Sequence, residues 1–149
     1  MAMLKEVEKP YKTKAALKEV LHYIMKKCVA VEGGAVDPEY AAECMLILKD
    51  VYHKPEGRQI RHFVLSFSTA DDIELECVCQ INRLITALFM ESFQVVSAVH
   101  TDTNLFHIHF VINTVSYLDG MMYSGGYSML NVVKQYLNSY YPALLIRIV

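Results

Sequence analysis

Hydrophobic residues recur along this chain at two spacings, one typical of helices and one typical of strands. Apolar side chains between Leu17 and Ile24 follow helical spacing, and Thr13 before them is a good N-cap. A second helix is expected to begin at Asp37-Pro38, a common N-cap and first-turn pair. In all, this spacing predicts four helices, at residues 13–27, 37–54, 73–90 and 128–140.

Runs rich in β-branched and aromatic residues predict five strands, at residues 4–7, 60–67, 93–101, 106–117 and 144–149. The third and fourth strands are separated by a short polar segment, Asp102-Thr103-Asn104, and are expected to form a hairpin. This order predicts an α+β fold, a mostly antiparallel five-stranded sheet with helices packed mainly on one face. A length of 149 residues without repeats or long linkers suits one domain spanning residues 1–149.

The strand at 106–117 alternates two kinds of side chain. Successive strand residues point to opposite faces of a sheet, so Phe106, Ile108 and Phe110 form a core face. His107 and His109 share the other face, which therefore carries two imidazoles at successive same-side positions.

A third histidine lies on the preceding strand, since His100 is expected nearly opposite His107 or His109 across the hairpin. Directly opposed Cβ atoms lie roughly 5 Å apart, so three imidazoles can converge on one ion at about 2.1 Å. Asp102 lies on the His100 side and is a candidate to orient an imidazole. Three His ligands leave coordination positions open, which suits catalysis. The pattern alone fits a zinc hydrolase or a metal-assisted phosphoryl-transfer enzyme.

Composition and charge limit the class of protein that carries this site. No uninterrupted apolar run has the length of a membrane span, and the first ten residues lack the apolar segment of a secretory signal. The four Cys form no zinc-type pair, so free thiols in a reducing cytoplasm are expected. The net charge is −2, yet seven of the ten Lys lie among the first 27 residues. This segment is either a solvated helix face or a surface that meets phosphates.

The histidine segment resembles the third motif of relaxases, the mobilisation nucleases of plasmids and integrative elements within the HUH endonucleases. The resemblance is carried by His100-x-Asp102 followed by His107-Ile-His109 and by Asn113. Residues 17–24 are similar to the first motif of the family, residues 39–52 to the helix that follows, and residues 61–68 to a strand that ends in Ser-Phe. These segments are collinear with the family and extend from about Ala15 to the C-terminus.

The resemblance implies an enzyme that nicks single-stranded DNA at a transfer origin. A tyrosine would attack a phosphodiester, leaving a 5′-phosphotyrosine and a free 3′-hydroxyl. A divalent cation, Mg²⁺ or Mn²⁺, would be held by His100, His107 and His109. Single-stranded DNA is the expected partner, and accessory mobilisation proteins are further candidates.

The chain has ten Tyr, so the nucleophile must be chosen among them. Tyr23 lies in the segment that matches the first motif and is the leading candidate, with Asp102 as a base that could act through water. Tyr11 is a weaker candidate. Tyr136 and Tyr140 share a helix face after the histidine motif, where rolling-circle replication initiators place their tyrosine.

Several polar residues are candidates to bind DNA: Lys14, Lys18, Lys26, Lys27, Ser66, Ser68 and Asn113. His62 is expected to be a structural residue or a DNA contact, not a metal ligand. Three other functions stay open at this point: a replication initiator or transposase-type HUH nuclease, a non-catalytic DNA-binding module, and an unrelated three-histidine zinc hydrolase.

Overall fold

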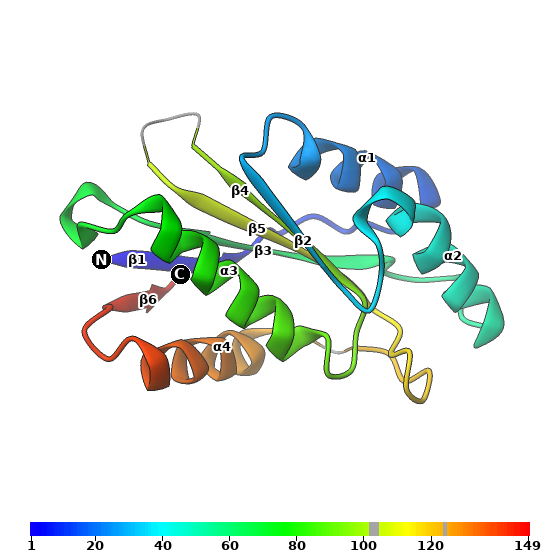
Figure 1. Ribbon diagram of the computed structural model, residues 1–149. Helices are drawn as coiled ribbons and strands as arrows, with labels where there is room; N and C mark the ends of the chain where they lie inside the picture. The colour runs from blue at the N-terminus through cyan, green and yellow to red at the C-terminus, as the bar shows by residue number, and fades with distance from the viewer. Residues whose placement is uncertain (102–104, 124) are drawn as a thin grey trace.

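The computed structural model describes residues 1–101, 105–123 and 125–149, and these form one mixed sheet with a pair of helices on each face (Figure 1). The elements in chain order are β1 (Ala2–Glu6), α1 (Lys14–Met25), β2 (Ala30–Gly34), α2 (Ala41–Val51), β3 (Ile60–Ser66), α3 (Leu75–Phe89), β4 (Val95–His100), β5 (His107–Asn113), α4 (Tyr127–Tyr140) and β6 (Ile146–Ile148). Two short 3₁₀ helices, Pro38–Tyr40 and Thr69–Asp71, precede α2 and α3.

The sheet has six strands in the order β2-β4-β5-β3-β1-β6. Every neighbouring pair is antiparallel except β1 and β6, which run parallel. The prediction of an α+β fold with a mostly antiparallel sheet agrees with this arrangement, but the predicted number of strands was one too few. The missed strand is β2, which pairs with β4 at the edge of the sheet.

Strand β2 was not predicted from the sequence, because the strand ends in two glycines that suggest a turn. The structure gives Gly34 a packing role: a Cβ built on it would lie 2.6 Å from Cβ of Met90 and 2.7 Å from Cγ1 of Val95. Such distances are far below van der Waals contact, so the end of α3 can approach the strand this closely only where there is no side chain.

The expectation that helices lie mainly on one face is wrong. Helices α3 and α4 cover one face of the sheet, where Ile81 and Ile85 share a core with Phe63 and Phe110. Helices α1 and α2 cover part of the other face, where Leu21 and its neighbours pack on Val96, Ala98 and Val111. Helical periodicity identified which stripe of each helix is buried, but it carries no information about which face of the sheet that stripe covers.

A lysine is buried beneath α2. Lys49 is only 1% exposed, and its Nζ donates hydrogen bonds to Oδ1 of Asn113 at 2.6 Å and to Oγ1 of Thr114 at 3.1 Å. The side-chain amide of Asn113 in turn donates to Oε1 of Gln94 at 3.0 Å. These bonds join α2 to the end of β5. They also show that the predicted DNA contact Asn113 is fully buried and holds the fold together, because its side chain lies in the interior.

Raising the pH should stabilise the folded protein through Lys49. Burial lowers the pKa of its ammonium group from 10.5 to about 8, so between these values the unfolded chain binds more protons than the folded one. The free energy of unfolding should therefore increase with pH, by about 2 kcal/mol between about pH 7 and about pH 10. Urea unfolding at a series of pH values measures this increase.

The matched variants are Lys49→Met, which keeps the length of the side chain, and Lys18→Met at an exposed position of α1. The increase should disappear in Lys49→Met and persist in Lys18→Met. The same pH dependence in all three proteins would contradict the assignment to Lys49.

Candidate functional site

The pairing of three central strands brings the histidines together. His107 lies opposite His100 on β4 and opposite Ser66 on β3. His109, two residues further along β5, lies opposite Val64. Paired residues and residues two apart point to the same face, so these side chains form two adjacent rows on the face that α1 partly covers. The expected convergence of the three histidines on one face is therefore present.

Each imidazole of the trio has a defined hydrogen-bond partner. Nε2 of His100 lies against the backbone carbonyl of Ile24 at the end of α1, and because a carbonyl only accepts, this nitrogen carries the proton. Nδ1 of His107 lies 3.2 Å from Oγ of Ser66. The ring centroids of His100 and His109 are 4.7 Å apart.

His62, which the sequence suggested as a structural residue or a DNA contact, lies beside the three histidines. Its Nε2 lies 3.0 Å from Nδ1 of His109, and its Nδ1 lies 3.0 Å from the hydroxyl of Tyr11. Burial, together with the nearby His109 and Lys9, lowers the pKa of His62 to about 3, so this imidazole is neutral. A signal for it was present: His62 is four residues before Ser66 on β3, and the strand period puts both on one face.

Tyr23 reaches the histidines from α1. Its ring centroid lies 5.9 Å from that of His109, in an edge-on arrangement, and 6.4 Å from that of His100. The side chain is 58% exposed, although Leu21 and Ile24 beside it are buried. The helix thus uses its apolar stripe to pack on the sheet and presents Tyr23 at the margin of that stripe.

The other tyrosine candidates lie elsewhere. Tyr136 and Tyr140 contact each other on α4, with ring centroids 5.3 Å apart. Helix α4 packs on the opposite face of the sheet from the histidines. Tyr11 lies at the site but is 8% exposed, and burial raises the pKa of its hydroxyl.

These residues line a cavity of about 860 Å³ between α1, the segment before it and the sheet. Tyr23, Ser66 and the four histidines of the site are among its lining residues. The lysines that line it are Lys5, Lys9 and Lys12, whereas the predicted contacts Lys14, Lys18, Lys26 and Lys27 are exposed elsewhere on and after α1. The sequence shows that this segment is basic, but it could not show which of its lysines turn toward the sheet.

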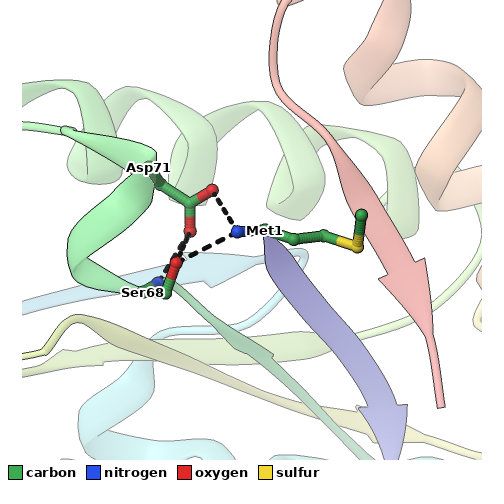
Figure 2. Close-up of polar contacts among 3 residues, drawn as sticks. All are labelled: Met1, Ser68 and Asp71. Atoms are coloured by element: carbon green, nitrogen blue, oxygen red, sulfur yellow. Dashed lines mark hydrogen bonds and ion pairs between the residues drawn. The ribbon is translucent and has the colours of Figure 1, made fainter.

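Of two further predicted site residues, one lies away from the cavity and the other is not among the residues that the structure describes. Figure 2 shows Ser68 with its backbone N–H and its hydroxyl on the carboxylate of Asp71, while the amino group of Met1 donates to Oγ of Ser68 at 3.0 Å. Ser68 thus caps the short helix before α3. Asp102, proposed as a base, lies outside the described residues.

The imidazoles of this site offer nitrogen donors of the kind that bind metal ions. Among residues 1–101, 105–123 and 125–149, no three His, Cys, Asp or Glu side chains are arranged as a metal-binding group. The chemistry of the donors nevertheless fits: His100 has its proton fixed on Nε2, and Nδ1 of both His107 and His109 lies against a polar partner. Such outer partners are what orient imidazole ligands in metal sites.

None of the helices in the described part of the chain has the length and apolar character needed to cross a membrane.

Comparison with known proteins identifies the family to which this chain belongs. A family model described as "Relaxase: MobA/VirD2-like, nuclease domain" matches residues 17–140. Protein rlx of Staphylococcus aureus is 26% identical over 123 residues, which are 83% of this chain and 38% of that protein. The chain therefore corresponds to well under half of that relative's length. The family match extends from α1 to the end of α4 and includes Tyr23 and all four histidines of the cavity, and the chain belongs to the relaxase family of MobA/VirD2-like nuclease domains.

Proposed function

We propose that this domain nicks single-stranded DNA at the transfer origin of a plasmid or integrative element. In this reaction the hydroxyl of Tyr23 attacks a phosphodiester and gives up its proton, and a P–O bond forms to the tyrosine oxygen. The bond from phosphorus to the 3′-oxygen breaks, and the leaving 3′-oxygen takes up a proton. The products are a 5′-phosphotyrosine and a free 3′-hydroxyl. The observation that carries the proposal is the position of Tyr23, an exposed phenol whose ring lies against His100 and His109 at the mouth of a cavity.

Activation of the phosphate is assigned to the histidines. A neutral phenol is a weak nucleophile, and a phosphodiester resists attack until its developing charge is neutralised. His100, His107 and His109 would hold Mg²⁺ or Mn²⁺ through imidazole nitrogens. When bound, the cation supplies the Lewis acidity that polarises the scissile phosphate.

His62 serves the site as a positioning residue. Because its Nε2 lies against Nδ1 of His109, it would fix the orientation of the His109 imidazole as a metal ligand. The Tyr11 hydroxyl holds His62 in turn from the far side. This chain of contacts starts outside the matched family range, at Tyr11, and ends at a proposed ligand.

The lysines supply the general affinity for DNA. Lys5, Lys9 and Lys12 line the cavity and would contact phosphates next to the scissile one, while Lys14 and Lys18 lie further out on α1. Contacts of this kind are independent of sequence and weaken with salt. Accessory mobilisation proteins are further candidate partners.

Tyr23→Phe should abolish covalent attachment of the protein to DNA. The change removes only the hydroxyl, at an exposed position, so folding and DNA binding should be retained. The measurement is a denaturing gel of the protein after incubation with Mn²⁺ and a randomised pool of single-stranded oligonucleotides, in which the adduct migrates more slowly.

Tyr136→Phe and Tyr140→Phe are the matched controls, because α4 lies on the other face of the sheet. Both should form the adduct as the parent does. An adduct that persists in Tyr23→Phe and is lost in the Tyr136/Tyr140 double variant would move the nucleophile to α4, as in replication initiators. No adduct from any protein, parent included, would favour a non-catalytic module.

Mn²⁺ should bind with about one ion per chain in calorimetry, and His107→Ala should lose most of this binding. His62→Gln should weaken it by about 10- to 100-fold, as expected for a partner that orients a ligand. Affinity should also fall as the pH is lowered, because imidazole ligands must be deprotonated. His22→Ala, at an exposed position of α1, is the control and should bind as the parent does. Unchanged affinity in Ala variants of His100, His107 and His109 alike would contradict the site.

A further inference from the structure

The sheet face that carries the histidines continues past the cavity onto two strands whose described side chains on that face are exposed. Beyond β3 lie β1 and β6, at the edge of the sheet. On these strands Ala2, Leu4 and Ile146 are buried against the α3 and α4 side. Met3, Lys5 and Arg147 alternate with them and are exposed on the histidine side.

Strand register connects this surface to the site in a single row. His107 pairs with Ser66, Ser66 pairs with Met3, and Met3 pairs with Arg147. Neighbouring strands lie about 4.8 Å apart, so the row extends about 14 Å from His107 to the outer strand. Lys5 stands in the next row, opposite Val64, and also lines the cavity. The open surface and the cavity are therefore continuous.

The chemistry of the open surface formed by these two rows suits single-stranded nucleic acid. Two cations, Lys5 and Arg147, flank an exposed thioether side chain, Met3, which is 47% exposed. The acidic residue of β1, Glu6, is on the opposite face, where its carboxylate binds Arg61 at 2.8 and 3.0 Å. The surface thus combines two positive charges, which suit the phosphate backbone of a single strand, with an exposed apolar side chain against which a base can pack.

We infer that the surface formed by Met3, Lys5 and Arg147 binds the segment of single-stranded DNA that flanks the cleavage site. Arg147 and Lys5 contact phosphates, and Met3 contacts a base between them. This inference rests on the proposed function and extends it to β1 and β6, which lie outside the matched range 17–140. The strand would leave the cavity at Ser66 and cross the sheet toward its edge.

Binding to oligothymidylates of two lengths tests the inference, with fluorescence anisotropy over a range of salt concentrations as the measurement. The longer probe, about 16 nucleotides, can occupy both the cavity and the open surface, and the shorter one, about 4 nucleotides, only one of them. Arg147→Gln should weaken binding of the long probe roughly fourfold at about 0.15 M salt and reduce the log–log salt slope by about 0.7. Met3→Ala should weaken it with little change in slope.

The matched control is Arg83→Gln, an exposed arginine on α3 at the opposite face of the sheet. It should bind both probes as the parent does. Arg147→Gln should also bind the short probe nearly as the parent does, because the cavity suffices for it. Thermal unfolding of each variant verifies that the fold is intact.

The possible failures are distinguishable. If Arg147→Gln and Arg83→Gln bind the long probe equally well, or if Arg147→Gln loses the same factor with both probes, the inference is overturned while adduct formation by the parent still supports the nuclease. If the parent forms no adduct, the proposed function fails, and a selective loss in Arg147→Gln would then assign the surface to a binding module.

Discussion

The register between β5 and its two neighbours is the constraint on which the rest of this domain depends. His107 pairs with His100 on one side and Ser66 on the other, while Ile108 and Phe110 point into the core beneath α3. Since side chains alternate with a period of two, a slip by one residue would place the imidazoles in the apolar core. Burial of the aromatic and aliphatic residues on one face therefore fixes the position of the histidines on the other.

One part of the sheet face that carries the histidines packs against helices, and another part lines the cavity. At one end Val96 and Val111 are covered by α1 and α2 and form a second core. At the other end the same strands present His107 and His109 to a cavity. Helix α1 spans the boundary: its buried stripe anchors it to the sheet, the carbonyl of Ile24 holds His100, and Tyr23 projects at its margin. Packing of α1 thus sets the distance between the tyrosine and the histidines.

Buried polar groups connect these elements and limit how they can shift. Lys49 ties α2 to Asn113 at the end of β5, and Tyr11 ties the segment before α1 to His62 on β3. A buried polar group that loses its partner costs roughly 1–3 kcal/mol, so alternative placements of these segments are disfavoured. Beyond β3 this network ends, and the face opens onto exposed Lys5 and Arg147.

The sequence by itself determined the fold class, the four helices and the histidine strand. Helix caps and apolar periodicity are local signals, and alternation along one strand is enough to place His107 and His109 on a common face. The relaxase resemblance also rested on contiguous motifs, and the family comparison confirmed it. Edge strand β2 was not predicted, because the reason for its last glycine, Gly34, is the close approach of the end of α3, a contact between segments distant in the chain.

Only the tertiary structure decided which face each helix covers and which polar residues reach the site. His62 and Lys9 can be read from the sequence, but their roles depend on cross-strand neighbours and on the path of the segment before α1. Asn113 matched a motif position and yet lies in the interior, because the ammonium group of Lys49, 64 residues away in the chain, binds its side chain. The local pattern of residues determines to which face of its own strand a side chain points. Its contacts with other residues are determined by packing between elements that are distant in the chain, and the local pattern carries no information about that packing.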